Sequence, residues 1–142
     1  MFRFKKKELS EEELNLAEQC RQEAESLYRS GKYNCAEAVL EAVRRRFTPE
    51  LSESLVQAVS GFGGGSGAGC ICGAVSGGTV LLGLALKDDK KAVSRMTQEL
   101  HTWFKGNYGV TCCKTIRRTH KGICPALTGE TAGKIGEMLE KY

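Results

Sequence analysis

The chain has 142 residues, a length typical of one globular domain, and a single domain over residues 1–142 is therefore expected. Hydrophobic residues make up 41% and charged residues 27%, which excludes a disordered tail protein, and the two prolines exclude a proline-rich chain. The formal net charge of +4 is too small for an extended nucleic-acid-binding surface, so no nucleic-acid partner is expected. The 17 glycines and seven cysteines need a local explanation.

Residues 1–8 begin with a basic run that no apolar stretch follows, and we expect them to form a flexible N-terminal segment. Since no secretory signal is visible, a cytoplasmic, reducing location is expected. An odd number of cysteines in a reducing compartment favours metal ligands or redox thiols over a lattice of structural disulfides.

Helical periodicity dominates the first half of the chain. The capping box at Ser10–Glu13 predicts a first helix that ends at Gly31, and Asn34 is suited to cap a second. Thr48 and Pro49 resemble a cap followed by proline at the first helical position, which predicts a third helix.

A glycine-rich loop over residues 61–69 precedes the one long apolar segment, Cys70 to Leu86. We interpret this segment as a buried central helix whose glycines let neighbouring backbones approach. Its 17 residues fall short of the roughly 20 that span a bilayer, so no membrane insertion is expected. A fifth helix is predicted from about Lys90 to Lys105, and a final helix capped by Thr128. The fold class is all-α: a single compact multi-helix bundle.

The cysteines fall into two groups. Cys20 lies on the inward face of the first helix, where a thiol acts as a small hydrophobic side chain. The other six lie at or near predicted helix N-termini or in loops, where unpaired N–H groups and the helix dipole stabilise a thiolate: Cys35, Cys70, Cys72, Cys112, Cys113 and Cys124.

The glycine loop is expected to serve the same chemistry. Backbone N–H groups before a helix N-terminus can converge on an anion such as a thiolate, a phosphate or a cluster sulfide. The spacing of Gly63, Gly65 and Ala68 fits a relaxed dinucleotide fingerprint, but it follows a helix rather than a strand, which argues against nucleotide binding. The backbone positions expected to contact a cofactor are Gly63, Gly64, Gly65 and Gly73.

Cysteine spacing does not match a zinc ribbon or a thioredoxin-like motif. On a helix the side chains of Cys70 and Cys72 would point apart, and those of adjacent Cys112 and Cys113 diverge as well. Each pair is therefore expected to give one sulfur to a common site, which would also include Cys35 and Cys124.

Several motifs together resemble the C_GCAxxG_C_C family of small redox-active proteins with four characteristic cysteines. They are Tyr33-Asn-Cys35-Ala36, Gly61-Phe-Gly-Gly-Gly65, Cys72-Gly-Ala74-Val-Ser-Gly77, Cys113-Lys-x-Ile116 and Cys124-Pro125, and the resemblance runs from about Tyr28 onward. It implies that the four sulfurs are those of Cys35, Cys72, Cys113 and Cys124, with Cys70 and Cys112 as extras. Cys113 is preferred over Cys112 because Lys114 and Ile116 follow it.

Two forms of redox chemistry remain open. Four thiolates would hold an iron–sulfur cluster or a zinc ion, with glycine N–H groups tuning its potential. Alternatively, no cofactor is bound and Cys72 and Cys35 cycle between dithiol and disulfide, with Cys72 expected to attack. A different hypothesis is a non-catalytic accessory or interaction module with a structural four-cysteine metal site. The expected partner is an unidentified redox protein, and a homo-oligomer is compatible with the sequence.

Overall fold

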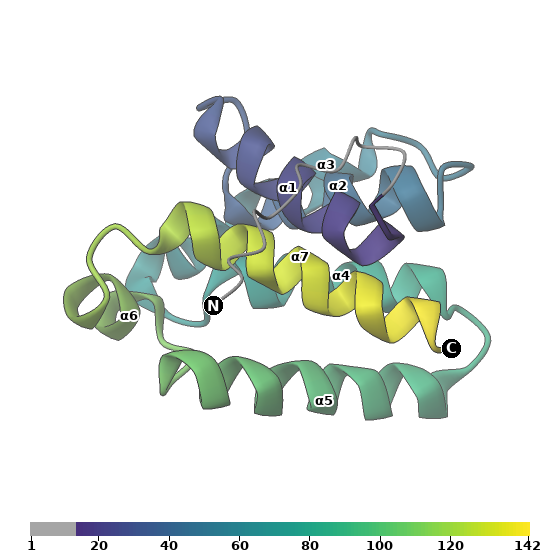
Figure 1. Ribbon diagram of the computed structural model, residues 1–142. Helices are drawn as coiled ribbons and strands as arrows, with labels where there is room; N and C mark the ends of the chain where they lie inside the picture. The colour runs from purple at the N-terminus through teal and green to yellow at the C-terminus, as the bar shows by residue number, and fades with distance from the viewer. Residues whose placement is uncertain (1–13) are drawn as a thin grey trace, which may run out of the picture.

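The computed structural model describes residues 14–142 of the chain, and this part is helical throughout, with no strand (Figure 1). The all-α prediction is confirmed. The expected flexible segment 1–8 and the Ser10 capping box lie outside the described residues. The helices are α1 (Leu16–Arg29), α2 (Cys35–Phe47), α3 (Leu55–Ala58), α4 (Gly73–Ala85), α5 (Lys90–Tyr108), α6 (Cys113–Thr119) and α7 (Cys124–Glu140), with short turns η2 (Ser60–Phe62) and η3 (Gly65–Gly69).

Helices α2 and α7 occupy the middle of the bundle. α7 packs against α1, α2, α4 and α5, and α2 packs against α1 and α4. Figure 1 shows α7 running between α1 and α5, with α6 at one end of the bundle and the connection from α4 to α5 at the other. Within residues 14–142, no helix is long and apolar enough to cross a membrane.

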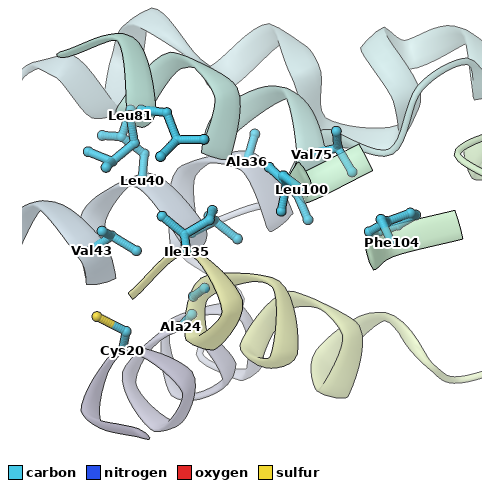
Figure 2. Packing of buried hydrophobic residues seen from close by; sticks show 14 of the residues in the cluster. Cys20, Ala24, Ala36, Leu40, Val43, Val75, Leu81, Leu100, Phe104 and Ile135 are labelled. Atoms are coloured by element: carbon cyan, nitrogen blue, oxygen red, sulfur yellow. The ribbon is translucent and has the colours of Figure 1, made fainter. Parts of the chain in front are cut away.

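The hydrophobic core lies where α2, α4, α5 and α7 meet. Leu40, Leu81, Leu100 and Ile135 come from α2, α4, α5 and α7, are fully buried, and gather in Figure 2. Cys20 of α1 is also fully buried, and its burial raises the pKa of this thiol to about 12. Cys20 is therefore a packing residue, as the sequence predicts.

Glycine lets α4 approach the backbone of α2. A Cβ atom at Gly77 would lie 2.5 Å from the carbonyl oxygen of Ala36, closer than side-chain carbons come to backbone atoms. The expectation that glycines in the central helix permit close backbone contact is thus confirmed at Gly77. It does not hold at Gly83, where a Cβ atom would meet nothing within 4 Å.

The predicted helix start at Thr48 and Pro49 is wrong. Thr48 caps the C-terminus of α2, donating its N–H to the carbonyl oxygen of Arg44 at 2.9 Å. The Arg44 guanidinium in turn donates to the carbonyl oxygens of Pro49 at 3.5 Å and Leu51 at 2.7 Å. These bonds from a buried arginine hold the segment as an irregular turn, and α3 begins only at Leu55.

Three other helix boundaries differ from the predicted ones. α4 begins at Gly73 rather than Cys70, and α5 continues to Tyr108 before Gly109 ends it. α7 begins at Cys124, with proline in its first turn, where the missing N–H would have no partner in any case. Thr128, the predicted cap, is buried inside this helix. By contrast, Asn34 caps α2 as predicted, through a reciprocal capping box with Glu37.

The two glycines of α4 provide a matched test of the α2–α4 contact. We expect Gly77→Ala to lower the free energy of unfolding by about 2 kcal/mol, because its methyl group must push α2 and α4 apart. Gly83→Ala should raise it by about 0.5 kcal/mol, since alanine there meets no neighbour and favours helix. Urea unfolding followed by circular dichroism measures both values, and equal stabilities of the two variants would contradict the close approach.

Candidate functional site

The four cysteines of the predicted site all lie where a helix begins. Cys35, Cys113 and Cys124 are the first residues of α2, α6 and α7, and Cys72 directly precedes α4. The N–H groups of a first helical turn have no partner within the helix. Sulfur atoms at these positions therefore have backbone donors beside them, as the sequence analysis expects.

A short antiparallel bridge joins the segment before α4 to the segment before α6. The N–H of Cys72 donates to the carbonyl oxygen of Thr111 at 2.8 Å, and the N–H of Cys113 donates to that of Cys70 at 2.6 Å. Ile71 and Cys112 face each other between these two bonds. Residues 70–72 are therefore extended rather than helical, and this pairing brings the second and third site cysteines together.

The glycine-rich loop folds into a tight turn against this bridge. The N–H of Cys70 donates to the carbonyl oxygen of Gly65 at 3.0 Å, and Gly65 has a φ of 66°. A Cβ atom at Gly65 would lie 2.5 Å from the Cys70 nitrogen and 2.8 Å from the Cys113 Cβ. Only glycine fits here, for both conformational and steric reasons.

The other predicted glycines lie against α2. A Cβ atom at Gly73 would lie 2.6 Å from the Cys35 sulfur and 2.6 Å from the carbonyl oxygen of Phe62. A Cβ atom at Gly63 would lie 2.6 Å from the side-chain nitrogen of Asn34, which donates to the carbonyl oxygen of Ser60 at 2.9 Å. The glycines thus pack around the thiols, and their contact with a cofactor stays a prediction.

Cys35 and Cys72 form a hydrogen-bonded pair in which Cys35 is the better anion. The Cys72 thiol donates to the Cys35 sulfur, and together with N–H groups of Gly64 and Ala36 this lowers the pKa of Cys35 to about 7. The same hydrogen bond, with burial, raises the pKa of Cys72 well above its ordinary value. From the sequence, Cys72 is expected to be the attacking thiolate, whereas these contacts favour Cys35.

Exposure of the two thiols follows the same order. Cys35 is half-buried, while Cys72 is only 6% exposed. The Cys35 sulfur is therefore more accessible from solvent than the Cys72 sulfur.

Cys113 and Cys124 lie near this pair. Burial raises the pKa of Cys113, and the nearby sulfurs of Cys35 and Cys124 raise it further. The hydroxyl of Tyr28 bonds to the Cys124 sulfur, and burial together with this thiol raises the pKa of the tyrosine. Arg117 of α6 lies close enough to oppose both pKa shifts.

Two tyrosines belong to the surroundings of the site, and sequence reasoning missed both. Tyr28 lies in the last turn of α1 and bonds through its hydroxyl to the Cys124 sulfur. Tyr108 ends α5, is 5% exposed and donates to Glu130; burial and this bond raise its pKa, with a further contribution from Cys72. Buried tyrosine hydroxyls need hydrogen-bond partners, but sequence alone does not reveal which partner each one finds.

Comparison with family models decides the family. The model described as "Putative redox-active protein (C_GCAxxG_C_C)" matches residues 33–138, which include all four site cysteines. The chain belongs to the C_GCAxxG_C_C family. Searches of curated proteins and of solved structures found no match.

Two further cysteines of this C_GCAxxG_C_C protein lie at the outer edge of the bridge. Cys70 is exposed and Cys112 is partly exposed. The sulfur of Cys112 lies 3.3 Å from the carbonyl oxygen of Gly69, and the hydroxyl and N–H of Thr115 lower its pKa. This C_GCAxxG_C_C chain therefore has two additional thiols on the segments that carry Cys72 and Cys113.

Across residues 14–142, no group of three or more Cys, His, Asp or Glu side chains is arranged to hold a metal ion. The thiols of Cys35 and Cys72 are free and share a hydrogen bond. The set Cys35, Cys72, Cys113 and Cys124 as metal ligands stays a prediction for this C_GCAxxG_C_C protein.

The pKa of Cys35 gives a direct test of the thiol pair. We expect iodoacetamide to modify Cys35 at a rate that rises with pH and is half-maximal near pH 7, because only the thiolate reacts. In Cys72→Ala the midpoint should move up by about one pH unit or more, since the strongest lowering contact is lost, whereas Cys72→Ser keeps a donor. Peptide mapping by mass spectrometry separates Cys35 from the other thiols. An unchanged midpoint in Cys72→Ala would contradict the pairing.

Proposed function

We propose that this protein carries out thiol–disulfide exchange, with Cys35 as the attacking thiolate and Cys72 as the resolving thiol. The observation that carries the proposal is the hydrogen bond from the Cys72 thiol to the Cys35 sulfur. Two sulfurs in hydrogen-bond contact need only a short movement to reach the roughly 2.05 Å of a disulfide bond. The reaction would be electron transfer to or from a disulfide-containing partner.

The exchange proceeds in two balanced steps. The Cys35 thiolate attacks one sulfur of a substrate disulfide, forming a mixed disulfide and releasing the other substrate sulfur as a thiolate. Cys72 then loses its proton to water and attacks the Cys35 sulfur, which releases the second substrate thiolate. The substrate disulfide gains two electrons, and the protein is left with a Cys35–Cys72 disulfide.

The hydrogen bond also sets the order of these steps. While Cys35 is a thiolate, its charge and its hydrogen bond hold the proton on Cys72. When Cys35 becomes part of a mixed disulfide, that charge is lost, and two causes of the raised Cys72 pKa disappear with it. Cys72 thus becomes a nucleophile only after a substrate has bound covalently, which suits a resolving thiol.

A second candidate function is metal or cluster binding by Cys35, Cys72, Cys113 and Cys124. It is favoured by the electrostatic influence of Cys35 and Cys124 on Cys113, which requires the three sulfurs to be near one another. An iron–sulfur cluster would supply one-electron chemistry, and a zinc ion would make the protein an accessory module with a structural site.

Oxidation by glutathione disulfide distinguishes these candidates. The anaerobically purified, reduced protein should release two equivalents of glutathione and yield a Cys35–Cys72 linked peptide under non-reducing mass spectrometry. Cys72→Ala should release one equivalent and keep glutathione on Cys35, because no resolving thiol remains. Cys112→Ser is the matched control and should behave like the unmodified protein.

Metal analysis of the same anaerobic preparation tests the second candidate, metal or cluster binding. Stoichiometric iron or zinc that is lost on replacing Cys113 or Cys124 by serine would favour the second candidate. A disulfide that links other cysteines would contradict the assignment of Cys35 and Cys72.

A further inference from the structure

The end of the bundle that carries the thiols contains no acidic side chain over long stretches of sequence. Residues 54–86, which form the glycine turn and α4, have no Asp or Glu, and neither do residues 100–129, which include α6. The second stretch does contain five Lys and Arg residues: Lys105, Lys114, Arg117, Arg118 and Lys121. Residues 100–129 therefore carry a net positive charge although the net charge of the chain is small.

The cations of α6 lie directly beside the thiols. A Cβ atom at Gly69 would lie 3.0 Å from the Cβ of Lys114, which places this lysine against the residue before Cys70. Arg118 lies close enough to Cys112 to favour its thiolate, and Arg117 acts on Cys113 in the same way. Positive charge from α6 thus lies beside Cys70, Cys112 and Cys113.

Within the described part of the chain, the cations of this end have no carboxylate partner, in contrast to the cations of α1, α2 and α7. Among the described residues 14–142, Lys114, Arg117, Arg118 and Lys121 form no ion pair, and all four are exposed. On α1, α2 and α7, by contrast, Arg21, Arg45 and Lys134 each pair with glutamate. Unpaired cations on one face leave a positive potential that an acidic surface can neutralise.

Apolar side chains lie within this basic face. Ile71 is 48% exposed and Val110 is 37% exposed, and they lie on the two segments that the bridge joins. The described residues have only two other exposed large hydrophobic side chains, Leu16 and Tyr142. Apolar residues at the centre and charges at the rim are the usual composition of a protein–protein interface.

We infer that the face formed by Ile71, Val110, Lys114, Arg118 and Lys121 docks an acidic redox protein and presents that partner's disulfide to Cys35. The inference rests on the proposed thiol–disulfide exchange and names the class of its substrate. The apolar pair would contact the surface around the partner's disulfide, and the cations would contact carboxylates at its edge. Such charge complementarity accelerates encounter and selects among partners.

Two model peptides of equal length test this docking. Each contains one internal disulfide, flanked by glutamates in one peptide and by lysines in the other, and each has a serine version that cannot react. Fluorescence anisotropy with the serine versions measures binding, and release of peptide thiol measures exchange. We expect the glutamate peptide to bind and to react at least about tenfold better than the lysine peptide at about 20 mM salt, with the difference lost at about 500 mM.

Charge reversal identifies the surface. The triple variant Lys114→Glu, Arg118→Glu, Lys121→Glu should prefer the lysine peptide. The matched control Lys87→Glu, Lys90→Glu, Lys91→Glu changes the net charge equally at the other end of the bundle and should keep the original preference (Figure 1). Arg117 is left in place because it lies beside Tyr28 and Cys113.

The outcomes separate docking from chemistry. Equal binding of the two serine peptides, or no binding of either, would overturn the docking surface. Tighter binding of a single-stranded DNA oligonucleotide than of the glutamate peptide would overturn the assignment to a protein partner. A preference for the glutamate serine peptide, together with exchange that persists in Cys35→Ser, would support the surface and contradict the proposed function instead.

Discussion

The approach of α4 to α2 is the constraint on which the site depends. At Gly77 the two helices come so close that a Cβ atom would lie 2.5 Å from the carbonyl oxygen of Ala36, and at Gly73 it would lie 2.6 Å from the Cys35 sulfur. This packing sets the N-termini of the two helices side by side. Cys35 and Cys72, which are far apart in sequence, then share one hydrogen bond in a place rich in backbone donors.

Local signals in the sequence predicted most of the helices, and they failed where a distant side chain decides the backbone. Asn34 and Gly31 mark helix ends that need nothing beyond the neighbouring residues, and both are confirmed. Thr48 and Pro49 carry an equally good start signal, but the guanidinium of Arg44 holds the carbonyl groups that follow. A cap pattern describes only neighbouring residues and does not include a side chain that binds these carbonyl groups. α3 therefore begins later than predicted.

The sequence predicted which cysteines form the pair better than it predicted which of them is the thiolate. Helix-start signals and the family resemblance both pointed to Cys35 and Cys72, because thiols before helices have a recognisable pattern. Which of the two carries the charge depends on the hydrogen bond from Cys72 and on the N–H groups, including that of Gly64, that reach the Cys35 sulfur. Those contacts exist only in the folded chain. The roles of Tyr28 and Tyr108 were out of reach for the same reason, since their partners come from other helices.

Close contacts of glycine residues hold the thiol pair in place, whereas exposed side chains form the surface beside it. Glycines at 65 and 73 leave no room for a substituent beside the sulfurs, so nearly any replacement there disturbs the chemistry. The side chain of Arg118 on α6 is exposed and can change without moving a sulfur atom. Related proteins can therefore diverge in what they recognise while the reacting centre stays the same.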